Sequence, residues 1–286
     1  MFEKELDMKN IGENLFHQSI SKSLRELGYV IIRNAIDKNR CIFYKSLITN
    51  AYEMQHKYVS DQGLLIPEQD IEKPYNGLGG DHQIAFWSRQ GQLHDAVFKT
   101  IFPGLSIYDI LDLLRFGVIL NKFFKGTYNV ETTSHARRIS PLKNERFKNY
   151  AGPLNFHTDA QHHNPHLFGI NIWTPLDDCG VSAPGLKIIP ASLYDVLDFL
   201  NVQFKNPVKS KNDVLISQDK LRELSNGFFD YLQSNKIVTP ELHVGDIMII
   251  HNWTVHSTYI TNEMTQSRLS LELRINSQNH FYPENT

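Results

Sequence analysis

The tripeptide His157-Thr158-Asp159 has the residue types and the spacing of part of a metal site. On an extended segment, or at its end, residues two apart project to one face, so an imidazole and a carboxylate could bind the same ion. With 13 His and 17 Asp in 286 residues, random placement gives 13 × 17/286, or about 0.8, His-x-Asp tripeptides. The tripeptide alone could therefore be a polar strand end in solvent, and its context must decide.

That context includes a turn-prone run before the tripeptide and candidate partners far along the chain. Residues 152–156 suit a turn followed by a short strand, and no other His precedes Asp or Glu by two positions. The possible second histidines are His243, His251 and His256. We select His256 because Arg268 follows it by twelve residues, which leaves room for a turn and a return strand. An adjacent antiparallel strand would bring Arg268 alongside His256, whereas His251 fits a packed or capping role.

Two imidazoles and one carboxylate on one face form the facial triad that holds Fe(II) in non-haem oxygenases and leaves other positions open. Arg268 supplies a planar donor fork that suits a carboxylate, unless it is a surface arginine on an exposed strand face. Ser270 shares the face of Arg268 and could donate its hydroxyl to the same carboxylate. The pattern thus predicts an iron site beside a dicarboxylate co-substrate.

The first part of the chain, about residues 1–120, has a helical pattern with a lid loop. Residues 14–26 predict an amphipathic helix that Gly28 ends, and residues 29–32 a buried strand. A longer helix is expected at residues 37–58 with Asp37 as its N-cap, and a short one at 109–116. The glycine-rich run at 76–80 predicts a mobile loop.

The second part, about residues 121–276, has short strands separated by Pro and Gly. The clearest are residues 166–174, 186–189, 246–251 and 268–275, and residues 191–235 form a helix-prone insertion, a second candidate lid. Such strands predict a sandwich or barrel with helices packed outside. Strict alternation in the last strand puts four polar side chains on one face, where a barrel could use them to line a cavity: Arg268, Ser270, Glu272 and Arg274.

Composition excludes several classes of protein. The net charge of −2 favours neither nucleic acid nor an acidic membrane as a partner, and no apolar run could span a bilayer. Two cysteines and the absence of a signal-peptide pattern predict a cytoplasmic protein of unknown oligomeric state. A basic stretch at residues 135–148 could meet an anionic small-molecule substrate, although we prefer to interpret it as a solvated loop.

Several separate segments resemble the phytanoyl-CoA dioxygenase family of Fe(II)/2-oxoglutarate oxygenases, in the order that the family has them. The resemblance covers most of residues 15–276 and is weakest in segments that would face a substrate. It is carried by residues 27–37, His157-Thr158-Asp159, residues 173–178, residues 184–192, Gly245-Asp246, His256, Arg268 and Ser270.

The resemblance implies a single domain over residues 1–286, with a double-stranded β-helix, or jelly-roll, core and helices outside. Fe(II) would be held by His157, Asp159 and His256, and Arg268 would bind the distal carboxylate of 2-oxoglutarate. Three further residues would line that pocket: Trp173, Thr258 and Ser270. With O2, such an enzyme hydroxylates, or otherwise oxidises, an unactivated C–H bond and releases succinate and CO2. Family halogenases lack the carboxylate, so Asp159 favours hydroxylation.

Two other functions remain open. Zn²⁺ at the same three ligands could activate water for hydrolysis, but Arg268 and Ser270 would then have no clear role. A non-catalytic jelly-roll binding protein could keep the fold, although it would not need the triad and Arg268 together.

Overall fold

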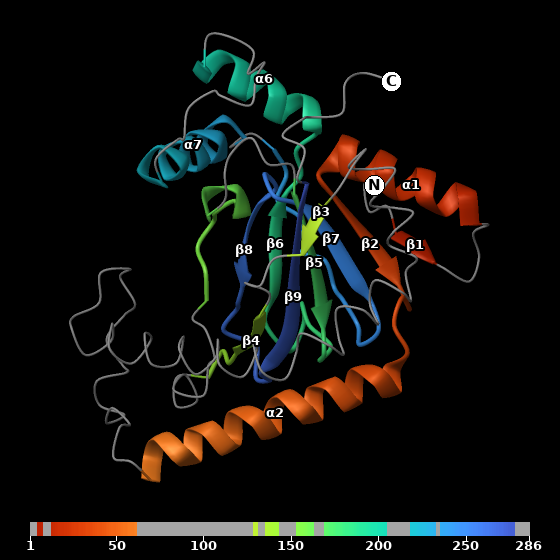
Figure 1. The fold of residues 1–286 in the computed structure, drawn as a ribbon, viewed down its shortest axis with the longest axis vertical. Coiled ribbons are helices and arrows are strands. Elements are labelled where there is room, and N and C mark those ends of the chain that lie inside the picture. The colour runs from red at the N-terminus through yellow and green to blue at the C-terminus, as the bar shows by residue number, and fades with distance from the viewer. Residues whose placement is uncertain are drawn as a thin grey trace.

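The computed structural model describes residues 5–7, 13–61, 128–130, 135–142, 153–162, 169–204, 218–232 and 235–277 (Figure 1). The loop expected at 76–80 and the helix expected at 109–116 lie outside the described residues, as do the lysines and arginine of the basic stretch at 143–148.

Most of the described strands form one large, mainly antiparallel sheet. Its order is β1-β2-β7-β5-β9-β3, and β4 also pairs with β9, beside β3. Only β1 and β2 are parallel to each other. The strands of this sheet are β1 (Glu5–Asp7), β2 (Tyr29–Arg33), β3 (Tyr128–Val130), β4 (His135–Ile139), β5 (Gly169–Pro175), β7 (Ile247–His251) and β9 (Arg268–Ser277).

A smaller sheet of β6 (Gly185–Ile189) and β8 (Val255–Tyr259) packs over one face of the large sheet. Apolar side chains from both sheets share one buried cluster, in which Trp173 and Met248 meet Leu186 and Ile188. Isolated bridges extend the small sheet on both sides, since Val238 pairs with Ile188 and His157 with His256. The expected jelly-roll core is confirmed.

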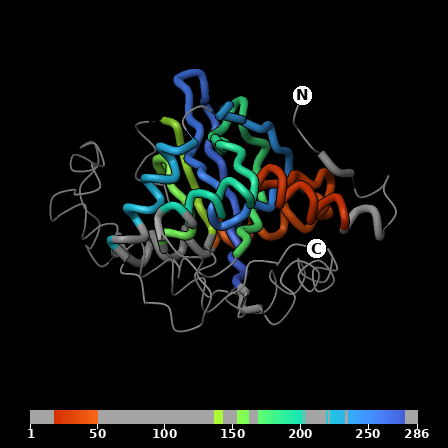
Figure 2. Tube along the Cα trace, turned by 90° about the horizontal axis from the view of Figure 1, so that it is seen from above, coloured from red at the N-terminus to blue at the C-terminus, as the bar shows by residue number. Residues whose placement is uncertain are grey.

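Two N-terminal helices cover the other face of the large sheet, as the apolar pattern predicted. Ile20 of α1 (Glu13–Leu27) and Tyr44 of α2 (Lys38–Asp61) are buried in one cluster with the leucines of β9. Figure 2 shows the coloured parts of these helices, in red and orange, beside the central strands. Asp37 is the predicted N-cap, because its Oδ1 accepts hydrogen bonds from the backbone N–H groups of Asn39 and Arg40.

Gly28 ends α1 and starts β2 with a backbone conformation that few other residues adopt. Its φ is 75°, and its N–H donates to the carbonyl of Leu24. A Cβ at this position would lie 2.7 Å from the carbonyl oxygen of Ala191, so the helix, the strand and the turn before α6 meet here without room for a side chain.

Two further helices, α6 (Leu193–Phe204) and α7 (Gln218–Tyr231), lie in the insertion expected at residues 191–235. Phe199 and Phe228 bury their rings against Trp253 in a second apolar cluster that also contains Ala160. This cluster packs against the short 3-10 helix η3 (Asp159–His162). The described helices thus support the segment that carries Asp159, and a lid role for the insertion stays a prediction.

No described helix is long and apolar enough to cross a membrane.

Candidate metal centre

The predicted ligands His157 and His256 are held together by the backbone. They form an antiparallel bridge in which each N–H donates to the carbonyl of the other, at 3.0 and 2.9 Å. Their rings therefore lie on the same side, with centroids 4.3 Å apart. The small sheet fixes this spacing, because His256 belongs to β8 and His157 lies on the neighbouring extended segment.

Both imidazoles have the same hydrogen bond to the backbone. Nδ1 of His157 lies 2.8 Å from the carbonyl of Asn155, and Nδ1 of His256 lies 2.9 Å from the carbonyl of Thr254. A carbonyl oxygen can only accept, so Nδ1 carries a proton in each ring, which leaves Nε2 as the nitrogen that a metal could bind. Metal-binding histidines in proteins are commonly oriented in this way.

Asp159 completes the triad at the start of η3. One ligand atom from each of the three residues lies within 4.8 Å of the others, a spacing that can hold a metal ion. The side chain of Asp159 is 2% exposed. Thr158, between two ligands, bonds to Ser225 of α7 through its N–H at 3.2 Å and its hydroxyl at 3.0 Å. The three predicted ligands therefore lie together, and their binding of a metal stays a prediction.

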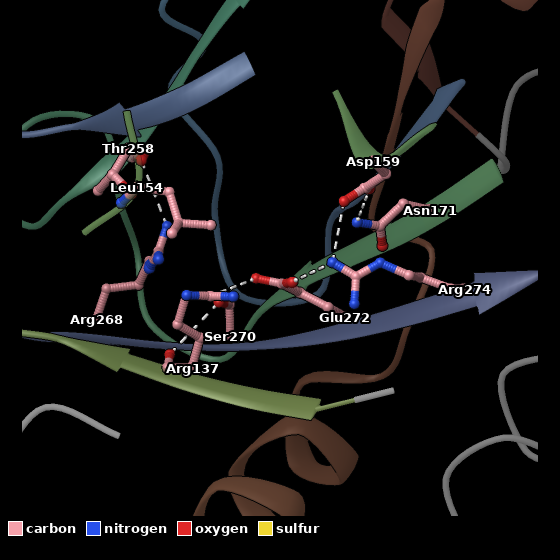
Figure 3. Close-up of polar contacts among 10 residues, drawn as sticks. Arg137, Leu154, Asp159, Asn171, Thr258, Arg268, Ser270, Glu272 and Arg274 are labelled. Atoms are coloured by element: carbon pink, nitrogen blue, oxygen red, sulfur yellow. Dashed lines mark hydrogen bonds and ion pairs between the residues drawn. The ribbon is translucent and has the colours of Figure 1, made fainter. Parts of the chain in front are cut away.

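Asp159 is held by two side chains that the sequence reasoning did not connect to it. Asn171 donates from Nδ2 to one carboxylate oxygen at 2.9 Å, and Arg274 donates from Nη2 to the other at 3.0 Å (Figure 3). Burial by itself would raise the pKa of Asp159, but the charge of Arg274 beside it holds that pKa well below its usual range. Asp159 is therefore a carboxylate, the form that binds a metal.

His157 is also in the form that a metal requires. Its pKa is lowered to about 3, mainly because burial disfavours the imidazolium and further because of His256 beside it. The ring is therefore neutral over the physiological pH range. A neutral imidazole and an ionised carboxylate next to each other are the ligand states that bind a divalent ion without first losing a proton.

Arg268 is a buried cation with unused donors. It is 1% exposed, and its Nη1 lies 3.3 Å from the carbonyl of Gly185. Within the described part of the chain, its buried Nε and Nη2 have no hydrogen-bond partner. Its guanidinium carbon lies 4.9 Å from the ring centre of Trp173. Burial lowers its pKa to about 10, so it remains charged at neutral pH.

The route by which Arg268 reaches the site differs from the prediction. We expected its strand to pair with the strand of His256, but β8 pairs with β6 whereas β9 pairs with β3, β4 and β5. The two residues lie in different sheets, and the side chain of Arg268 extends towards β6 across the interior. The strand alternation was predicted correctly, since the leucines of β9 face the helices.

The other predicted co-substrate contacts have varied surroundings. Trp173 is buried beside Arg268, and its indole Nε1 has no hydrogen-bond partner among the described residues. Ser270 is fully buried, with its hydroxyl 3.5 Å from the carbonyl of Arg137. Thr258 uses its hydroxyl to accept a hydrogen bond from the N–H of Leu154 at 2.9 Å. Their contacts to a co-substrate stay predictions.

The interpretation of the basic stretch as a solvated loop is wrong for residues 135–139. They form β4, paired with β9, and Arg137 is 8% exposed. Its Nε donates to Glu272 at 3.0 Å, because both side chains lie on the interior face of adjacent strands. Burial of Arg137 was missed because its cross-strand partner is over a hundred residues away in the sequence.

Comparisons with known proteins give remote structural similarities. No protein-family model matches the chain, and a search of curated proteins found no match. The non-haem alpha-ketoglutarate-dependent carbocyclase SnoK from nogalamycin biosynthesis is similar with a TM-score of 0.49 and 16% identity, over 94% of this chain and 85% of that one. AviO1 from Streptomyces viridochromogenes Tue57 has a TM-score of 0.46 and 13% identity, over 92% of this chain and 95% of that one. EvdO2 from Micromonospora carbonacea var. aurantiaca, complexed with 2-oxoglutarate, has a TM-score of 0.44 and 14% identity, over 94% of this chain and 91% of that one.

Proposed function

We propose that this protein is an Fe(II)- and 2-oxoglutarate-dependent oxygenase of the phytanoyl-CoA dioxygenase-like type. It would hydroxylate, or otherwise oxidise, an unactivated C–H bond of a small molecule and release succinate and CO2. The observation that carries the proposal is Arg268, a buried cation with two unpartnered nitrogens in the same interior as the His157, Asp159 and His256 triad.

The donor set fits Fe(II). Two neutral imidazoles and one carboxylate are ligands of intermediate hardness, and three protein ligands leave positions for a chelating 2-oxo acid and O2. When bound, iron and 2-oxoglutarate would supply the activated oxygen that attacks the C–H bond. His157, Asp159 and His256 would hold the metal, and the fork of Arg268 would bind the distal carboxylate of the co-substrate.

Trp173 has a clear part in this arrangement. Its ring packs against the guanidinium and restricts it to one orientation, which reduces the entropy lost when a carboxylate binds. Ser270 and Thr258 would line the same pocket, Ser270 from β9 and Thr258 from β8.

The described residues give little support to an anionic substrate. The charge of Arg137 is paired with Glu272. Arg138 points to the opposite face of β4, the face on which Ala136 is buried against the helices. A small molecule is therefore the proposed substrate class, without a requirement for negative charge, in a protein we still predict to be cytoplasmic.

The two alternatives are less well supported. Zn²⁺ at the same three ligands could activate water for hydrolysis, but the two buried, unpartnered donors of Arg268 would then have no clear role. A non-catalytic binding protein would not need the triad and these donors together.

An anaerobic spectroscopic titration tests the proposal. With Fe(II) and 2-oxoglutarate, the protein should develop the weak visible metal-to-ligand charge-transfer band of an iron-chelated 2-oxo acid. His157→Ala should abolish the band, whereas His243→Ala, which changes a half-exposed histidine outside the triad, should leave it unchanged. Folded wild-type protein that shows no band would refute the proposal. Succinate release across a panel of small molecules would then identify the substrate.

A further inference from the structure

Asn171 and Arg274 face each other across two strands of the large sheet. They are register partners in the antiparallel pairing of β5 with β9, so their side chains project from neighbouring points on the same face. Each donates to a different oxygen of Asp159, which comes from outside this sheet. A cross-strand pair therefore donates one hydrogen bond to each oxygen of the Asp159 carboxylate (Figure 3).

Asp159 and Arg274 are part of a line of alternating charges. Arg274 also lies 3.4 Å from one oxygen of Glu272, and the other oxygen of Glu272 accepts from Arg137. The side chains of the four charged residues, Asp159, Arg274, Glu272 and Arg137, are between 2% and 11% exposed. In such surroundings each charge acts strongly on the next, because little water screens them.

We propose that Asn171 and Arg274 are positioning residues that set the orientation of the Asp159 carboxylate, and that Glu272 limits the positive charge that Arg274 applies to it. The affinity of the triad for a divalent metal would then depend on residues that do not touch the metal. This inference rests on the proposed function only in taking the triad as a metal site.

The geometry explains why two donors are needed. A carboxylate turns easily about its last torsion, which has broad minima. With one donor on each oxygen, that rotation is fixed, and each oxygen keeps a lone pair for a metal. Loss of either donor would free the group to turn away from His157 and His256, whose own orientation is fixed by their backbone hydrogen bonds.

The charge of Arg274 has a cost that Glu272 offsets. An arginine beside a metal ligand repels a metal cation and draws electron density from the carboxylate. Glu272 shares that arginine and so reduces the positive potential at the metal position. The second cation, Arg137, keeps Glu272 in place from the adjacent strand.

Titration with Co(II), without 2-oxoglutarate or substrate, tests the proposal on the folded full-length chain. Arg274→Met and Asn171→Leu should each bind Co(II) about 10- to 100-fold more weakly than wild type, the range usual for loss of such partners. Glu272→Gln should weaken it severalfold. Lys187→Met is the control, since it removes a cation of the small sheet that lies 5.6 Å from the ring centre of Tyr259, and its Co(II) affinity should stay within about twofold of wild type.

Arg274→Lys distinguishes positioning from a general effect on folding. It keeps the positive charge but replaces the rigid guanidinium, whose Nη2 donates to both Asp159 and Glu272, by a flexible ammonium. Its Co(II) affinity should lie between those of wild type and Arg274→Met, and it serves if the Met variant does not fold. Folded variants of Asn171 and Arg274 that bind Co(II) as tightly as wild type would overturn the proposal.

The outcomes separate this inference from the proposed function. One outcome is that Co(II) binding depends on the triad and weakens in the Asn171 and Arg274 variants, but wild type gives no charge-transfer band with Fe(II) and 2-oxoglutarate. This would support the positioning role and refute the oxygenase. A normal band together with unchanged Co(II) affinity in these variants would refute the positioning role alone. Wild-type protein that binds no metal would overturn both.

Discussion

Replacing Arg268 by Met should change the stability of the free protein and its affinity for 2-oxoglutarate in opposite directions. Met has a long unbranched chain that can occupy the space of the arginine stem, but it has no charge and no donor. In the free protein, Arg268 is a buried cation that, among the described residues, has one hydrogen bond, to the carbonyl of Gly185 at 3.3 Å, and two nitrogens without a partner. The substitution therefore removes the unfavourable burial of a charge and breaks few hydrogen bonds.

The expected magnitudes follow from this environment. Replacement of buried charge by an apolar side chain is often neutral or stabilising by roughly 1–4 kcal/mol, so free Arg268→Met should be at least as stable as wild type. When 2-oxoglutarate binds, the same change leaves a buried carboxylate unpaired, which costs about 3–5 kcal/mol. That cost corresponds to a dissociation constant roughly 10²- to 4 × 10³-fold higher.

Thermal unfolding with and without the co-substrate measures both effects. At 100 times its dissociation constant, 2-oxoglutarate should stabilise metal-loaded wild type by about 2.7 kcal/mol. For a chain of this size, that raises the midpoint by roughly 5 °C or more. Arg268→Met should lose this shift at the same concentration. Lys187→Met, which removes a cation lying 5.6 Å from the ring centre of Tyr259 on the neighbouring sheet, is the control and should keep it.

Two results would contradict this reasoning. A free Arg268→Met protein that is several kcal/mol less stable than wild type would mean that the arginine serves the fold. Unchanged 2-oxoglutarate affinity would mean that the co-substrate carboxylate lies elsewhere.

Two further predictions concern the supports of the site. Burial lowers the pKa of His251 to about 3, so the unfolded chain, with an ordinary pKa near 6.5, binds more protons between these values. Stability should therefore be complete above about pH 6.5 and fall as the pH drops towards 3. His251→Asn, which keeps an acceptor for the Trp253 N–H, should reduce that fall in urea unfolding at pH 7 and 5, and an equal fall would contradict the assignment. Ser225→Ala removes the partner of the Thr158 N–H and hydroxyl and should cost about 1–3 kcal/mol in the same assay. A cost below about 0.5 kcal/mol would show that α7 does not brace the ligand segment.

The ligand residues could be predicted from the sequence because their signals are local or ordered along the chain. His157 and Asp159 lie within three residues, and His256 and Arg268 follow in a recognisable order. The strict alternation in β9 also gave the interior face of that strand correctly. These signals depend on side-chain period and on turn residues, both of which are present in a single sequence.

The partners of the ligands could not be predicted, because they depend on strand register between distant segments. Asn171 is opposite Arg274 only because β5 pairs with β9 in one particular alignment. One signal was available, since Asn171 lies between two isoleucines in a buried strand, and a buried amide needs a partner. The sequence could not name that partner, nor show that Arg268 would reach the site from the opposite sheet.

The charges of the interior explain why Arg268 has no carboxylate partner from the chain. Among the buried residues that the structure describes around the triad, there are three cations, Arg137, Arg268 and Arg274, and two anions, Asp159 and Glu272. A third anion beside Arg268 would make the free protein neutral there and more stable, but it would occupy the place proposed for the co-substrate. Fe(II) alone would raise this charge from one to three, whereas Fe(II) together with 2-oxoglutarate, whose charges are equal and opposite, would leave it unchanged. Because unbalanced buried charge is costly, this arrangement favours binding of the metal together with the co-substrate over binding of the metal alone.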